Sequence, residues 1–183
     1  KRSDLVAIVD ILKDNDIIQD KNKIIDLIIK NEDIRALLNT KDISQPEDLV
    51  YTYVFPFLKL PKTQDIARNY ITMKLSSEDI LKSNKIYKDY TLTLCTISHE
   101  DEMKTCYGAT RIDLLSAALL KIFAWNKTLG FELKPISEDE DILDGTYYIK
   151  QITFRTLTPN SMKCGVKLMA RYDINLSDLF FNK

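Results

Sequence analysis

Apolar and polar positions alternate over residues 86–97. The two faces of this segment carry apolar residues and small polar residues, respectively: Tyr90, Leu92 and Leu94 against Thr91, Thr93 and Cys95. Because successive side chains of a strand point to opposite faces, the pattern predicts a long strand with one face in the core. Residues 67–75 alternate in the same way, and consecutive strands usually pair, so the two segments are predicted to be neighbours in one sheet.

Residues 109–125 follow a helical period instead. Apolar residues recur there at steps of three and four: Ile112, Leu115, Leu119, Ile122 and Phe123. Gly108 lets the backbone turn sharply, Thr110 can cap the helix, and Asp113 stands at the spacing of a capping box. We therefore predict an amphipathic helix that packs on strand 86–97 through the apolar stripe formed by Ile112, Leu115, Leu119 and Ile122.

The N-terminal part of the chain is predicted to be helical. Helices are expected at 3–13, 20–29 and 32–38, where apolar residues follow a helical spacing. Residues 20–29 are rich in isoleucine, so a strand is the alternative there, although the pairs 24/28 and 25/29 favour a helix. A helical turn is also predicted at 45–50, because proline is tolerated at the start of a helix.

The segments on either side of strand 67–75 are predicted to be irregular. Residues 51–61 are apolar and aromatic and contain Pro56 and Pro61, which predicts an extended, buried connector. Residues 76–85 are predicted to form the loop between strand 67–75 and strand 86–97.

A second hairpin is predicted after the helix. Alternation at 129–134 and at 148–156 gives its two strands, and the acidic residues 137–145 are expected to form its projecting tip. A strand at 166–172 and a terminal turn at 177–181 complete the predicted elements.

These elements predict an α+β fold, in which a mixed or antiparallel sheet of about four strands with a long hairpin is backed by helices. A chain of 183 residues suits one domain rather than two. The expected domain has a helical N-terminal segment (1–44), an α/β core (45–158) and a C-terminal extension (159–183).

Composition argues against nucleic-acid-binding and membrane proteins. The net charge is −1, from 26 basic and 27 acidic side chains, so no overall field attracts nucleic acid. No apolar run has the length of a membrane span, and no signal-peptide pattern opens the sequence, so we expect no membrane association. Three irregularly spaced cysteines predict reduced thiols in a cytosolic setting.

Each candidate for chemistry has a simpler structural interpretation. Cys95, His99 and Cys106 lack the paired spacing of a zinc site, and the consecutive residues 100–102 cannot converge on one point for acid–base catalysis. The acidic run 138–144 holds five carboxylates but not the spacing of a calcium-binding EF-hand loop. We therefore expect no catalytic residue, no metal and no cofactor, and predict that all three thiols are free.

Five charged residues are candidates for contacts between subunits. Capping explains Thr110 and Asp113 but not Arg111, whose alternatives are a solvated position and an intersubunit salt bridge. The acidic tip supplies the other four candidates: Glu138, Asp139, Glu140 and Asp141. Unpaired carboxylates are costly to bury, so the tip is expected to project, and its four-residue replacement by serine is expected to impair assembly without unfolding the protomer.

The order of segments over residues 48–157 resembles the small head–tail joining proteins of tailed bacteriophages, especially the tail-terminator or tail-completion (neck) group. The segments that carry the resemblance follow one another along the chain: Phe55-Pro56-Phe57-Leu58, strand 70–75, Cys95-Thr96-Ile97-Ser98-His99, the helix start at 103–113, Tyr147-Tyr148 and Thr153-Phe154. The resemblance implies a structural virion protein, not an enzyme, that forms a homo-oligomeric ring, typically hexameric, at the end of the tail tube.

The implied ring joins the tail tube protein to a head connector or stopper protein, and DNA passes through it without specific binding. Its implied location is the neck of the virion, after assembly in the host cytoplasm. A head–tail connector adaptor or stopper protein and a non-viral protein-interaction domain are the alternatives, followed by a small metal-dependent hydrolase. Ring closure requires two different, complementary faces on each protomer.

Overall fold

The computed structural model describes residues 16–40, 43–60, 68–81, 84–143 and 145–159. The predicted helix at 3–13, the strand at 166–172 and the turn at 177–181 lie outside the described residues, as does the C-terminal extension except for its first residue, Pro159.

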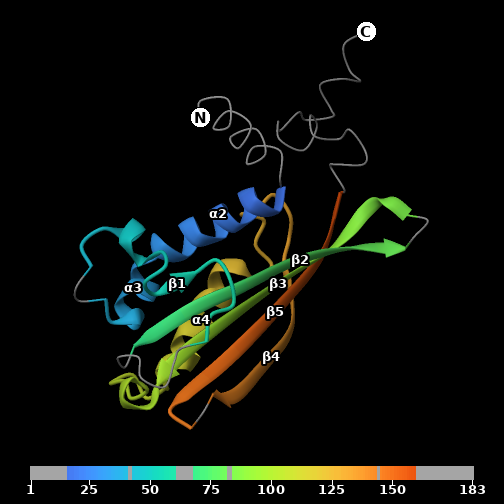
Figure 1. The fold of residues 1–183 in the computed structure, drawn as a ribbon. Helices are drawn as coiled ribbons and strands as arrows, with labels where there is room; N and C mark the ends of the chain where they lie inside the picture. The colour runs from blue at the N-terminus through green and yellow to red at the C-terminus, as the bar shows by residue number, and fades with distance from the viewer. Residues whose placement is uncertain (1–15, 41–42, 61–67, 82–83, 144, 160–183) are drawn as a thin grey trace.

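A five-stranded mixed sheet forms the centre of the fold (Figure 1). Its strands, in chain order, are β1 (Val54–Phe55), β2 (Asn69–Leu81), β3 (Asn84–His99), β4 (Lys134–Leu143) and β5 (Tyr147–Pro159). In space the order is β1-β2-β3-β5-β4, with β1 parallel to β2 and every other pair antiparallel. The predicted α+β class with a mixed sheet is confirmed, and the strands number five rather than about four.

The pairing of β2 with β3 confirms the predicted neighbours, but the expected loop between them is wrong. Residues 76–81 continue β2, and Leu81 already pairs with Asn84 at the start of β3. The apolar alternation stops at Ser76-Ser77-Glu78 because this end of the sheet lies away from the centre of the core, where side chains need not be apolar. Figure 1 shows this end of the β2–β3 hairpin reaching past helix α2 (Asp16–Ile29).

The second hairpin is shifted relative to the prediction. Residues 129–133 form a loop rather than a strand, although Leu129 and Leu133 are buried and the Trp125 amide donates a hydrogen bond to the Leu133 carbonyl (2.9 Å). The acidic residues 137–143 form most of β4 and pair along β5. Both faces of this edge strand are largely exposed, so charged side chains cost little there.

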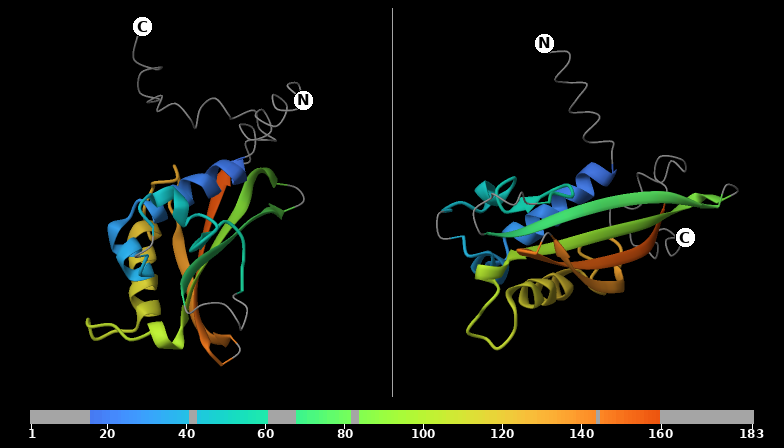
Figure 2. Two further views of the ribbon diagram at one scale, coloured as in Figure 1. Left: turned by 60° about the vertical axis from the view of Figure 1, so that its left-hand side comes forward. Right: turned by 60° about the horizontal axis from the view of Figure 1, so that its bottom comes forward.

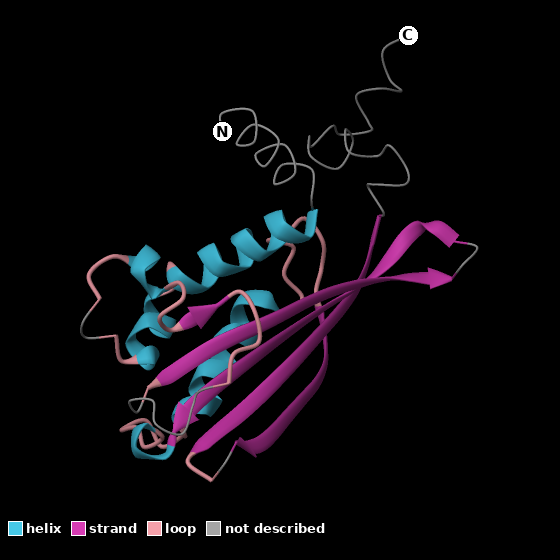
Figure 3. Cartoon of the chain, viewed as in Figure 1, coloured by secondary structure: helices cyan, strands magenta, loops and turns pink. Residues whose placement is uncertain are grey.

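Helices α2, α3 (Glu32–Leu38) and α4 (Arg111–Phe123) lie together on one face of the sheet (Figures 2 and 3). The helical interpretation of residues 20–29 is confirmed, but α2 starts at Asp16, four residues earlier than predicted. Caps fix the other two starts: Asn31 accepts from the Ile34 amide and Thr110 from the Asp113 amide. Short 3₁₀ turns lie at Pro46–Leu49 and Glu100–Glu102.

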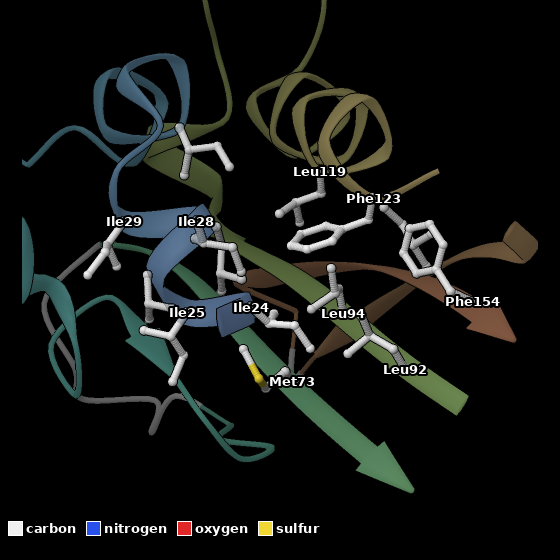
Figure 4. Packing of buried hydrophobic residues seen from close by; sticks show 14 of the residues in the cluster. Ile24, Ile25, Ile28, Ile29, Met73, Leu92, Leu94, Leu119, Phe123 and Phe154 are labelled. Carbon is white, nitrogen blue, oxygen red and sulfur yellow. The ribbon is translucent and has the colours of Figure 1, made fainter. Parts of the chain in front are cut away.

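The main core fills the space between the helices and the sheet (Figure 4). Ile24 and Ile28 of α2, with Leu119 and Phe123 of α4, meet apolar side chains of the three central strands: Met73, Leu92, Leu94 and Phe154. The predicted packing of the helix is confirmed, with one difference at its C-terminal end. Phe123 is buried there, whereas Ile122 is only partly covered.

A smaller cluster lies on the opposite face of the sheet at the β1 end. It joins Phe55, Tyr70, Ile97 and Tyr147, and the Lys59 ammonium lies 4.1 Å from the centre of the Phe55 ring. The connector that was predicted to be buried is therefore buried only in part: the segment from Tyr53 to Phe55 is inside, and the following apolar residues are exposed.

Candidate functional site

The acidic strand β4 is linked to the rest of the sheet by one lysine. The Lys150 ammonium lies 3.1 Å from Glu138 and 2.9 Å from Glu140 on β4, and 2.8 Å from Asp113 on α4. The Lys150 side chain is only 14% exposed, because α4 and β4 approach it from two sides. Sequence alone did not reveal this lysine, since its three partners come from two other elements.

Charge pairing in this cluster shifts the pKa values of its members. Burial alone would lower the pKa of Lys150, but its hydrogen bonds to the three carboxylates outweigh burial and raise it. The hydrogen bonds from Lys150 and then from Thr110 lower the pKa of Asp113. Lys150 and Asp113 are thus both ionised at neutral pH, and three carboxylates surround the single lysine.

The four acidic candidates divide between the two faces of the sheet. Glu138 and Glu140 point to the helical face, where Lys150 meets them, whereas Asp139 and Asp141 alternate onto the other face. The expected projecting tip is therefore wrong, because the acidic run is a paired edge strand. Figure 1 shows β4 at the margin of the sheet, with its outer side open. We call residues 138–141 of β4 the acidic edge.

Arg111 is held inside the protomer. Its Nε donates to the Glu102 carbonyl (2.5 Å) and its NH1 group to the Leu37 carbonyl at the end of α3 (2.7 Å). A third interaction joins it to the Glu102 carboxylate at 3.6 Å. These contacts tie α3 to the start of α4, so Arg111 is not a solvated residue. The intersubunit salt bridge expected for Arg111 stays a prediction.

The residues considered for metal binding have separate local roles. Cys95 is buried, and its thiol lies 3.8 Å from the Gln151 side chain, whereas Cys106 is exposed in the loop before α4. His99 caps the turn Glu100–Glu102 by accepting from the Asp101 amide, and its ring packs edge-on against Tyr147. Among the residues that the structure describes, no group of three or more His, Cys, Asp or Glu side chains is arranged to hold a metal ion.

A buried polar pair joins α2 to the sheet. The Tyr90 hydroxyl donates to the carboxylate of Asp20 (3.3 Å), and both residues are buried. Burial raises the pKa of Asp20, and burial together with the nearby Asp20 carboxylate raises the pKa of Tyr90. No local sequence pattern indicates this pair, because 70 residues separate its members.

An exposed apolar patch lies at the opposite end of the sheet from the acidic edge. It consists of Tyr51 (66% exposed), Phe57 (47%), Leu58 (52%) and Leu60 (63%), which we call the β1-side patch. Pro56 and Pro61, which were taken to bound a buried connector, cannot donate the hydrogen bonds of a sheet, and this is the signal for an unpaired surface segment.

Tyr51 adopts a backbone conformation that is rare for a bulky residue. Its φ is 65°, in the left-handed region, and its amide donates to the Val54 carbonyl at 2.9 Å. Such strain persists only where the surrounding structure maintains it, and it often marks a functional surface. Tyr51 also contacts Phe57, with 6.4 Å between the ring centres.

Comparison with known proteins assigns the chain to a family. The sequence matches the YomW family over residues 7–156, which is most of the chain. No curated protein and no solved structure matches it significantly. None of the helices that the structure describes has the length and apolar character needed to cross a membrane. The family name is of the type given to phage gene products, and the chain belongs to the YomW family of phage-associated proteins.

Proposed function

We propose that this phage-associated chain is a structural virion protein that forms a ring at the head–tail junction, as a tail-terminator or tail-completion protein. In this role it joins the tail tube protein to the head connector or stopper protein and carries out no catalysis. The family match supports the phage association, and the order of its segments supports the neck.

The observation that carries the proposal is the one-sided arrangement of the fold. Helices cover one face of the five-stranded sheet, while none of the helices in the described part of the chain lies over the other face (Figure 2). Beyond the cluster at the β1 end, this second face carries mostly small hydroxyl, amide and charged side chains: Lys74, Ser76, Thr91, Thr93, Gln151, Thr153 and Arg155. Two exposed apolar residues, Tyr87 and Leu157, interrupt it toward the far end of the β2–β3 hairpin. A face of this composition is stable against water and can line an aqueous passage.

The charges on this face are compatible with the passage of DNA without tight binding. Arg155 is bound by both carboxylate oxygens of Asp89, so its charge is offset within the protomer. Lys74 and Lys134 are the other described basic side chains of this face on strands β2 to β5, and neither makes an ion pair with the described residues.

Two experiments test the proposal. Purified protein examined by light scattering after size exclusion and by negative-stain electron microscopy should form closed rings with a central hole, and ring closure should increase with concentration. A phage that lacks this gene should produce unjoined heads and tails, which the supplied wild-type protein should rejoin. A chain that stays monomeric at its highest soluble concentration, together with normal particles from the mutant phage, would refute the proposed role.

A further inference from the structure

We infer that the acidic edge of one copy docks on the β1-side patch of a second copy, so that one heterologous contact, repeated, links the protomers. This inference rests on the proposed function and names the two surfaces through which its ring would close. The two surfaces lie at opposite ends of the sheet, because β1 and β4 are its first and last strands.

Among the described residues, six of the ten large exposed apolar side chains lie at these two ends. The β1-side patch holds four large exposed apolar residues within a stretch of ten positions, and β4 adds Ile136 (56% exposed) and Ile142 (58%) beside the acidic edge. Large apolar groups that cluster on a surface mark interaction sites, unlike isolated ones.

Charge favours contact between the acidic edge and the β1-side patch over contact of either surface with itself. The acidic edge carries four carboxylates, of which two meet Lys150 and two, Asp139 and Asp141, form no ion pair with the described residues. The β1 end instead carries basic groups: Lys59 lies over the rings of Phe55 and Tyr70, and Arg68 over Tyr53. Opposite charges on the two surfaces favour their contact and set its orientation.

Self-pairing of the acidic edge is disfavoured by the same charges. In a two-fold contact, β4 would lie beside β4 of the second copy, and the acidic residues of both would face one another. Like charges directly opposite on paired strands are destabilising. When the acidic edge of one copy meets the β1-side patch of another, the pair still has one free acidic edge and one free patch. Further copies can therefore add until a ring closes.

Two double variants test the inference. Asp139→Lys with Asp141→Lys cancels the net charge of the acidic edge without touching the partners of Lys150, and Leu58→Asn with Leu60→Asn removes apolar surface from the β1-side patch. All four positions are exposed, so both variants should fold as the wild type does, which circular dichroism checks. Matched controls outside both surfaces are Asp33→Lys and Leu157→Asn, also at exposed positions.

Light scattering after size exclusion should find each double variant monomeric and both controls assembled. An equimolar mixture of the two double variants should form dimers and nothing larger, because one intact acidic edge can still meet one intact patch. Assembly of either double variant alone, or a mixture that stays monomeric while the wild type assembles, would overturn the inferred contact and leave the proposed ring standing. A wild type that never associates would overturn both.

Discussion

Replacing Leu119 by alanine tests whether α4 is fixed to the sheet by its apolar stripe. Leu119 is fully buried and points from α4 toward Leu94 and the ring of Phe123 (Figure 4). The change removes three carbon atoms, whose transfer from water contributes about 2.4 kcal/mol. Residual cavity volume adds to this loss, because close-packed surroundings relax only in part, so the expected total is about 3 to 4 kcal/mol.

Urea unfolding followed by circular dichroism measures this difference, and calorimetry should show a melting temperature lower by about 6 to 16 °C for a chain of this size. The protein should be kept at a concentration where it is monomeric, since association would add its own stabilisation. A matched control is Leu157→Ala, which makes the same chemical change at a side chain that is 59% exposed. Equal effects of the two substitutions would refute the packing of α4 described above.

Three further predictions concern individual side chains. Lys150→Met should lower the free energy of unfolding by about 1 to 3 kcal/mol at pH 7, measured in urea, because the carboxylates around Lys150 stay close together without its positive charge. The pKa of Asp113 in the folded protein is depressed, so the Asp113–Lys150 pair stabilises the wild type above the ordinary Asp pKa and loses this contribution as pH falls through the depressed value. The cost of the substitution should therefore shrink in acid. Asp20→Asn should raise the free energy of unfolding at neutral pH and not in acid. The pKa of Asp20 in the folded protein is raised, so ionisation of this carboxylate as pH rises through that value opposes folding. A variant without this pH-dependent gain would contradict the raised pKa of Asp20. Thiol titration should find three reactive groups in denaturant and a fast-reacting native thiol that Cys106→Ser removes, whereas fewer than three groups or stoichiometric zinc would overturn the free-thiol prediction.

The period of apolar residues was sufficient to predict a helix or strand wherever one face of that element meets the core. The stripe of α4 and the alternation of β2 and β3 follow from the spacing of apolar residues, because burial imposes a period of 3.6 or 2 on the sequence. The cap at Thr110 follows from the polar residues Thr110 and Asp113 three positions apart. The same reasoning failed at residues 76–81 and in the acidic run. These segments are strands with little buried surface, so their backbone pairing left no apolar pattern to detect.

The candidate site depends on contacts that no single segment encodes. The acidic run suggested a projecting tip because its carboxylates need partners, and the partner, Lys150, comes from the neighbouring strand. Likewise, the apolar segment after Phe55 was expected inside because apolar residues are usually buried, yet the sheet offers it no further surface to cover. Only the assembled fold shows that these two segments lie at opposite ends of one sheet.

The strand order also sets the order in which the chain can fold. Both hairpins, β2–β3 and β4–β5, join strands that are close in sequence, whereas the contact between Thr96 on β3 and Lys150 on β5 spans 54 residues. Closing a longer loop costs more entropy before its contacts form, so the hairpins should form early and the β3–β5 pairing late. If the β3–β5 pairing forms after the transition state, Ile152→Val on β5 should mainly speed unfolding, whereas a substitution at Ile142 in the early β4–β5 hairpin should mainly slow folding.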